Sequence, residues 1–258
     1  MLGPAEFGRQ LIKTGDLDPV YIAINGAKLP HKQLAKLLFA YWCFYHLGLA
    51  AWLSEQKHYW RSMRTAAENV TETPYGGPWP RGTERRHFRG YLAVRAVDIL
   101  SRKSPEAYVE ALLKMRTVAE IMGATSQWPL FGPWIGYKIA DMVDRCLGSP
   151  VEFTPDVCLL YKEPRAALDL IPGAVSAEQK LVDLLGELDD QKAPPTGDRA
   201  LGFAEVETVL CKWKSYRSKH YFIGKDIYEV RHHLAHWGAG TMLKAMPAVP
   251  FIFRGRMP

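Results

Sequence analysis

The sequence predicts a mostly α-helical fold, and three observations support that prediction. Apolar residues recur three and four positions apart through most of the 258 residues, the spacing of helices that bury one face. Helix-start signatures precede such stretches, as in Ser104-Pro105-Glu106, where serine suits the capping position and proline the first helical one. Neither a strand ladder nor an internal repeat is visible. We therefore expect helices joined by loops.

In the N-terminal half, the first helical stretch starts near Pro30 and reaches about residue 55, with a break near Gly48. A helix over 56–70 follows, and prolines and glycines then exclude regular structure over 71–84. Thr83-Glu84 opens a helix to about Ser101, before shorter helices at 104–114 and 117–122. The inward residues are expected to be Leu34, Leu37, Leu38, Tyr41 and Tyr45 in the first stretch, and Phe88, Leu92, Val97 and Leu100 in the later one.

In the C-terminal half, a helix over 131–145 follows a glycine-bearing turn, and Thr154-Pro155-Asp156 caps a short helix that Pro164 limits. Further helices are expected at 176–190, 203–216 and 226–237. The segment 189–202 is the best candidate for a mobile loop, and 217–225 for a basic turn. The tail after residue 244 is expected to be extended across the surface.

Charge is unevenly distributed along the chain. The net charge is +6 and the calculated pI is about 9.1, with basic patches at 81–95 and 212–225 and an acidic stretch at 178–207. Such patches favour a polyanionic partner without proving one. The four cysteines form no CxxC pair, so we expect reduced, mostly buried thiols rather than a zinc or cluster site. No apolar run reaches the ~18–20 residues of a membrane span, and no secretory signal opens the chain.

The stretch FGPWIGYKIADMVDR (131–145) carries the most informative motif. Gly132 and Gly136 allow a tight turn that feeds a helix start, where free backbone N–H groups and the positive helix end favour an anion. Lys138 follows two residues later, and Asp156 lies 156 − 138 = 18 residues beyond it. The alternative is an ordinary packing corner between two helices with a solvated lysine.

This arrangement resembles the helix-hairpin-helix DNA glycosylases, whose hairpin is followed by a lysine or its replacement and, about twenty residues on, by an aspartate. Gly136, Lys138, Ala140 and Asp156 match those positions, whereas Trp134 stands where the first hairpin glycine usually stands. The resemblance is closer to a bacteriophage branch, the alpha-glutamyl/putrescinyl thymine pyrophosphorylases or amino acid:DNA transferases. It extends over about residues 15–237, through AINGAKLP, LLFAYWCFYHLGLAAWLSE, WPRGTERRHFRG, FGPWIGYKIADMVDR and KSYRSKHYFIGKDIYE.

The resemblance implies a helix-hairpin-helix, DNA-glycosylase-like helical fold spanning residues 1–258 as one unit. Within it, residues 30–115 with 203–237 could form one lobe and 116–190 a second. It also implies a reaction in phage DNA: an amino acid or polyamine replaces the pyrophosphate on 5-pyrophosphoryloxymethyl-uracil. Excision of a modified pyrimidine by a glycosylase, or a non-catalytic DNA-binding module, are the alternatives.

That reaction would need no redox cofactor, although the hairpin leaves room for a monovalent cation. Its implied partners are phage DNA carrying modified thymine, an amino acid or polyamine, and a hydroxymethyl-uracil DNA kinase acting earlier. The implied location is the cytoplasm of the infected bacterial host. The amine itself, the oligomeric state and the preference for single or double strands are not readable from the sequence.

The implied reaction requires groups that hold the DNA, bind pyrophosphate and take a proton from the amine, and each requirement has candidate residues. Lys138 and Asp156 are the catalytic candidates, with Asp156 taking a proton from the amine or holding the ammonium, unless it serves only as a helix cap. The DNA backbone would be held by Gly132, Trp134, Gly136 and Tyr137. Cationic candidates for pyrophosphate or phosphate are Arg81, Arg85, Arg86, Arg89, Lys219, His220 and Lys225.

Aromatic residues supply the candidate base pocket. A flipped base would lie among Tyr41, Trp42, Tyr45 and His46, although for most of them a core stripe at helical spacing is the favoured interpretation. The histidines 232, 233 and 236 are not expected to form a zinc site, because no carboxylate or cysteine accompanies them at ligand spacing. We expect no metal.

Overall fold

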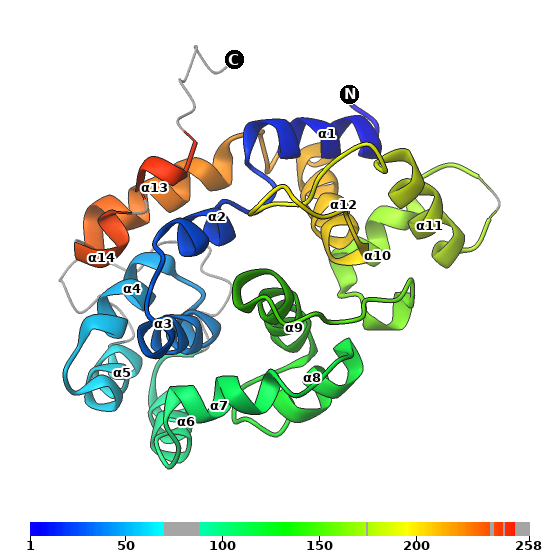
Figure 1. The fold of residues 1–258 in the computed structure, drawn as a ribbon. Helices are drawn as coiled ribbons and strands as arrows, with labels where there is room; N and C mark the ends of the chain where they lie inside the picture. The colour runs from blue at the N-terminus through cyan, green and yellow to red at the C-terminus, as the bar shows by residue number, and fades with distance from the viewer. Residues whose placement is uncertain (70–87, 174, 238–239, 245, 251–258) are drawn as a thin grey trace.

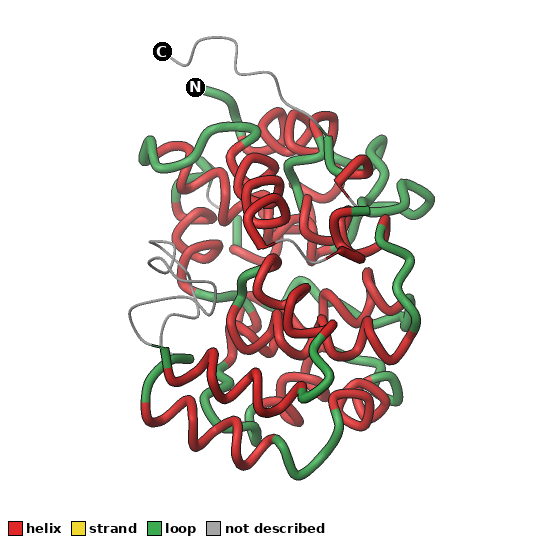
Figure 2. Tube along the Cα trace, turned by 90° about the vertical axis from the view of Figure 1, so that its left-hand side faces the viewer, coloured by secondary structure: helices red, strands yellow, loops and turns green. Residues whose placement is uncertain are grey.

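Helix α9 (Pro133–Leu147) lies at the centre of the molecule, with other helices around it (Figure 1). This computed structural model describes residues 1–69, 88–173, 175–237, 240–244 and 246–250. Across these residues the chain is helix and loop, with two isolated bridge pairs and no longer strand (Figure 2). The prediction of a mostly α fold is confirmed.

The remaining helices divide into those before α9 and those after it. Before it come α1 Pro4–Thr14, α2 Pro19–Gly26, α3 His31–Phe44, α4 Leu47–Glu55, α5 Tyr59–Glu68, α6 Tyr91–Leu100, α7 Pro105–Leu112 and α8 Val118–Thr125. After it come the 3-10 turn η1 Val157–Leu159, α10 Lys162–Asp169, α11 Ala177–Glu187, α12 Phe203–Arg217, α13 Lys225–Trp237, α14 Gly240–Leu243 and η2 Met246–Ala248. Helices α1 and α2 were not predicted.

Helices far apart in the sequence pack together around α9. Helix α13 packs on α4 and on α2, and α12 packs on α1, α10 and α11. Figure 1 shows α3–α7 to the left and below, α8 directly below, and α1 and α10–α12 above and to the right. Both ends of the chain therefore help to build the region above α9, where the cavity described below lies. The two-lobe division stays a prediction.

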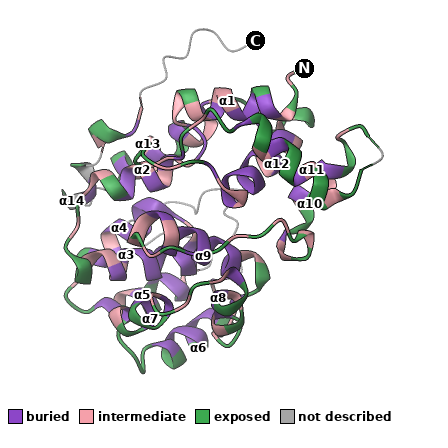
Figure 3. Cartoon of the chain, turned by 45° about the vertical axis from the view of Figure 1, so that its right-hand side comes forward, coloured by how far each residue is buried: buried purple, intermediate pink, exposed green. Residues whose placement is uncertain are grey.

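Helix α9 is buried almost all round, yet it carries charge. Every residue from Ile135 to Val143 is buried, as the central position of α9 in Figure 3 illustrates. A helix surrounded by protein is normally apolar on all sides. Here Lys138, Asp141 and Arg145, at helical spacing, form a polar stripe on one face. That stripe must be paired inside the protein, because unpaired buried charges are costly.

Several predicted element boundaries were wrong. The first helical stretch breaks at Tyr45, which adopts a left-handed conformation (φ 50°), and Gly48 lies inside α4. In the described residues the helix predicted from Thr83 begins only at Tyr91, and Leu92 is exposed rather than inward. Pro164 lies in the first turn of α10 instead of ending a helix, since its missing N–H needs no partner there. Ser104 caps α7 as predicted.

Candidate active site

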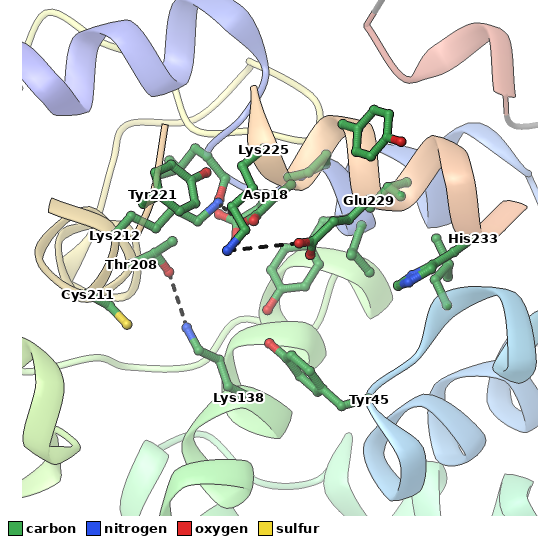
Figure 4. A pocket seen from close by; sticks show the side chains of 18 of the residues that line it. Asp18, Tyr45, Lys138, Thr208, Cys211, Lys212, Tyr221, Lys225, Glu229 and His233 are labelled. Atoms are coloured by element: carbon green, nitrogen blue, oxygen red, sulfur yellow. Dashed lines mark hydrogen bonds and ion pairs between the residues drawn. The ribbon is translucent and has the colours of Figure 1, made fainter. Parts of the chain in front are cut away.

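A cavity of about 540 Å³ opens above α9, between α2, α12 and α13. Its volume is within the range of small-molecule sites. Figure 4 shows charged side chains from three of these helices around it: Lys138 of α9, Lys212 of α12, and Lys225 and Glu229 of α13. Of the predicted residues, those lining it are Tyr41, Tyr45, Trp134, Lys138, His220 and Lys225.

Lys138 is a buried member of the cavity wall. Its Nζ donates to Glu207 Oε2 at 2.7 Å and to Thr208 Oγ1 at 3.2 Å, both on α12. Burial alone would lower the pKa of Lys138, but the neighbouring Glu207, and Asp141 and Asp18 farther off, together raise that pKa above its usual range. Lys138 is therefore a fixed cation at neutral pH. Its bonded partners are on α12, and Asp156 is not among them.

Arg145, also on α9, forms ion pairs with three carboxylates. Its guanidinium contacts Asp18 at 2.8 Å, Glu205 at 3.1 Å and Asp141 at 3.3 Å, and its side chain is fully buried. Asp141 also accepts a 2.8 Å hydrogen bond from the hydroxyl of Tyr21. One planar guanidinium thus holds α2, α9 and α12 together beneath the cavity.

Asp16 holds the N-terminal end of α13 in place. Its Oδ2 accepts from the Tyr221 hydroxyl and the Gly224 N–H, each at 2.6 Å, and its Oδ1 accepts from the Ile227 N–H at 3.0 Å. The carboxylate therefore caps the start of α13 from the α1–α2 loop. Gly224 has a φ of 98°, a conformation that favours glycine. This turn directs Lys225 toward the cavity.

Helix α13 forms the outer wall of the cavity. Lys225 and Glu229, one turn apart, approach to 3.9 Å, which is an ion pair without a close hydrogen bond. Burial and the nearby Asp226 raise the pKa of Glu229. Further along, His233 stacks on His46 with ring centroids 3.9 Å apart. Burial lowers the pKa of His233 to about 4, so this imidazole is neutral at pH 7.

Aromatic rings close the side of the cavity nearest α3. Tyr45 packs against Tyr41 with centroids 4.7 Å apart and edge-on against Trp134 at 4.9 Å. The other two residues of the predicted base pocket do not line the cavity. Trp42 is fully buried and donates to the Met142 sulfur. His46 is buried and caps α4, its Nδ1 accepting from Leu49 N–H at 3.1 Å. For these two, the alternative of core packing is the better description.

The turn expected over 132–136 ends earlier than predicted. Gly132 is the exposed cap of α9, and Pro133 already starts the helix. Gly136 lies in the first helical turn, where it lets α8 approach: a Cβ there would come within 2.9 Å of Thr125 Oγ1. Tyr137 is buried against Phe153. The cationic side chains near this helix start are Lys162 and Arg165, which with Trp134 line a second pocket of about 350 Å³.

Asp156 is exposed and lines neither pocket. Its Oδ1 accepts a 2.7 Å hydrogen bond from the Cys158 N–H and caps η1. The predicted capping role is confirmed. The catalytic role has no support from its position and stays a prediction.

The other predicted cations fall into three groups. Arg81, Arg85 and Arg86 lie outside the described residues. Arg89 is half-buried, and that burial lowers its pKa. Lys219 is exposed, with a left-handed φ of 60°, and does not line the cavity.

The described part of the chain contains no group of three or more histidine, cysteine or acidic residues arranged to hold a metal ion. None of its helices combines the length and apolar character that crossing a membrane requires. Among the cysteines, Cys43 is buried, Cys146 and Cys211 are half-buried, and Cys158 is exposed, so the prediction of burial was only partly right.

Sequence reasoning missed the acidic side of the cavity. Asp18, Asp226 and Glu229 line it, and Asp16, Glu205 and Glu207 lie behind it. One local signal was available for Asp18, because Asp-Pro is a helix-start dipeptide. It does cap α2, but its side chain makes no capping hydrogen bond and reaches Arg145 instead. For the other acidic residues, the spacing in the sequence is equally compatible with a solvent-exposed helix face.

Comparisons with known proteins agree on one family. A family model described as amino acid:DNA transferase matches residues 10–222. A glycinyltransferase of Pseudomonas phage PaMx11 is 40% identical over 281 aligned positions, which cover 95% of this chain and 96% of that protein. A putrescinyltransferase of Delftia phage PhiW-14 is 28% identical over 259, covering 92% and 80%. The chain therefore belongs to the amino acid:DNA transferase family, and it is a DNA-modifying transferase.

Proposed function

We propose that this transferase couples an amino acid or polyamine to 5-pyrophosphoryloxymethyl-uracil in phage DNA and releases pyrophosphate. The reaction forms a C–N bond at the base methylene and breaks the C–O bond to pyrophosphate. It needs a slot for the base, cations for the departing anion and a group that receives a proton from the amine. The supporting observation is that a single cavity is lined by aromatic rings, by cations and by carboxylates.

The base is proposed to enter beside Tyr45 and Trp134. A methylene buried in stacked duplex is not accessible to an amine, so the nucleotide must leave the stack or be single-stranded. The edge-on pair of rings offers an aromatic surface for that base. Cytosolic chemistry in the infected host and an upstream hydroxymethyl-uracil DNA kinase belong to the same proposal.

Pyrophosphate is proposed to leave toward Lys225 and His220. Both line the cavity, and Lys225 has only a loose ion pair with Glu229 and a 3.3 Å bond to the His220 carbonyl. Arg89, with Arg81, Arg85 and Arg86 preceding it, is proposed to add positive charge. Fixed cations of this kind stabilise charge that develops on a leaving group.

The DNA backbone is proposed to bind at the start of α9. The Trp134 and Ile135 N–H groups precede the first hydrogen bond of the helix, in which the Gly136 N–H donates to the Gly132 carbonyl, and Lys162 and Arg165 line a pocket with Trp134. The pair α8–α9 with its connecting turn would then be the helix-hairpin-helix element of a glycosylase-like fold. The reaction uses no redox cofactor, because substitution transfers no net electrons, and a monovalent cation at the turn stays a prediction.

A direct assay tests the proposal. Duplex and single-stranded oligonucleotides carrying one pyrophosphoryloxymethyl-uracil are incubated with glycine, glutamate or putrescine, and the nucleosides are analysed by mass. We expect one amine to give its adduct and equimolar pyrophosphate. Abasic sites instead of adducts would favour the glycosylase alternative, and an unchanged oligonucleotide with every amine would refute the proposal.

A further inference from the structure

Lys212 and Asp16 have no hydrogen-bonding capacity left for a ligand. Lys212 has three donors, and they go to Asp226 Oδ2 at 2.6 Å and to the carbonyls of Asp16 and Leu17 at 2.5 and 2.8 Å. Asp16 uses both oxygens to hold Tyr221 and the start of α13. Both residues therefore have a structural role, Lys212 in the cavity wall and Asp16 behind it.

Asp18 differs from them. Its Oδ2 accepts from Arg145 at 2.8 Å, whereas Oδ1 makes no hydrogen bond to any of the described residues. The side chain is 11% exposed, and that exposure is to the cavity it lines. One oxygen is thus held by a fully buried guanidinium, and the other remains available to a ligand. A carboxylate oxygen in this position accepts hydrogen bonds but cannot donate them when ionised.

The charge balance beneath the cavity also favours a cation. Arg145 alone faces three acids, and the whole set of buried and half-buried groups has more carboxylates than cations. The carboxylates are Asp16, Asp18, Asp141, Asp144, Glu205, Glu207 and Asp226, and the cations are Lys138, Arg145, Arg199, Lys212 and Lys225. Burial raises the pKa of Asp18, partly against the effect of Arg145. A bound cation would relieve this excess of negative charge.

We infer that Asp18 binds the primary ammonium group of the amine co-substrate at the cavity floor and then accepts its proton. The inference rests on the proposed function and assigns one of its steps. Asp18 takes a proton from R–NH₃⁺, and the freed lone pair attacks the base methylene. The C–O bond breaks as pyrophosphate leaves with its electron pair, and the product is a protonated secondary amine. An amino acid and a polyamine share the ammonium group.

The experiment compares Asp18→Asn with the wild type on the same modified oligonucleotide. Asparagine keeps the acceptor for Arg145 but removes the base, so kcat/KM for the accepted amine should fall about 100-fold or more. The KM for DNA should stay unchanged. Methoxyamine, which is neutral at pH 7, serves as a second nucleophile, and its transfer should be equal in the two proteins. Parallel series with glycine and putrescine identify the source of the ammonium group.

Two further variants separate chemistry from folding. Asp144→Asn is the matched control, because Asp144 contacts Arg199 at 3.2 Å in the same charge cluster but does not line the cavity. Transfer by this variant should equal that of the wild type. If Asp18→Asn does not fold, Asp18→Glu keeps a carboxylate for Arg145 but moves the second oxygen by one methylene, so transfer from ammonium substrates should fall while transfer from methoxyamine stays unchanged.

The outcomes distinguish this inference from the proposed function. No adduct from the wild type with any amine would refute the proposed function itself. A wild type that transfers an amine, beside an Asp18→Asn with the same kcat/KM, would overturn only the inference. An equal loss with methoxyamine and with ammonium substrates would also overturn it, since a structural role affects all nucleophiles alike.

Discussion

Lys138 and Asp156 were predicted as parts of one site, and the structure gives them opposite surroundings. Lys138 is buried on the central helix and bonded to Glu207 and Thr208 beside the cavity. Asp156 is exposed, caps three residues of 3-10 turn and lines no pocket. The charge on α9 is thus committed to an internal network, whereas the charge on the following segment faces solvent.

The spacing of residues in a sequence motif therefore does not determine whether those residues are buried together or exposed. The acids that raise the pKa of Lys138 are Glu207 of α12, Asp141 of α9 itself and Asp18 just before α2, the last 138 − 18 = 120 residues away, rather than an acid of the segment that follows α9. Buried charge should therefore dominate stability around α9, and the exposed segment should contribute little.

Glu207→Leu should have the largest effect on stability. It leaves the buried Lys138 ammonium without its 2.7 Å partner, and breaking a buried pair in this way costs about 3–5 kcal/mol. Urea unfolding followed by circular dichroism measures the loss. The double variant Lys138→Met/Glu207→Leu removes both charges and should recover most of the stability. A double variant as unstable as Glu207→Leu would show that packing, not charge pairing, is responsible.

His233 should make stability depend on pH. Its pKa of about 4 in the folded protein lies below the ordinary 6.5, so between these values the unfolded chain binds more protons. Stability is therefore present at neutral pH and lost as pH falls from about 6.5 toward 4, by about 2–3 kcal/mol for this group. His233→Gln should show a shallower decrease in melting temperature between pH 7 and pH 4.5. Parallel curves for the two proteins would contradict the assignment.

Gly136→Ala should disturb the contact between α8 and α9. The added methyl would lie 2.9 Å from Thr125 Oγ1 and 3.3 Å from the Met122 backbone, and such overpacking costs about 1–3 kcal/mol. Gly123→Ala on α8 is the control, since no atom lies within 4 Å of its Cβ position. It should stabilise by about 0.5–1 kcal/mol through helix propensity. Equal effects in thermal unfolding would argue against close approach at Gly136.

Asp156→Ala should have the smallest effect. Loss of the cap on η1 should cost about 1 kcal/mol or less, and transfer to modified DNA should be unchanged. Kinetics with a saturating amine measure the second quantity. A fall of about 100-fold in kcat would restore the catalytic role that the sequence suggested and remove the contrast drawn above.

Local features of the sequence were sufficient for much of the fold. Helix periodicity and the caps at Ser104 and Asp156 were predicted correctly. Errors arose where a boundary depends on tertiary contacts, as at Tyr45, or where an apolar residue lies outside the core, as at Leu92. The family, too, was identifiable from short strings, and the comparisons confirm it.

Periodicity and local residue patterns are enough to identify the helical class, the family and several residues that line the cavity. Which charges pair with one another depends on how the helices pack. Asp18 reaches Arg145 across 145 − 18 = 127 residues, and Asp16 caps a helix that begins 225 − 16 = 209 residues later. No local rule encodes such partners, since a buried charge is stabilised by whichever opposite charge the packing of helices brings within hydrogen-bond distance.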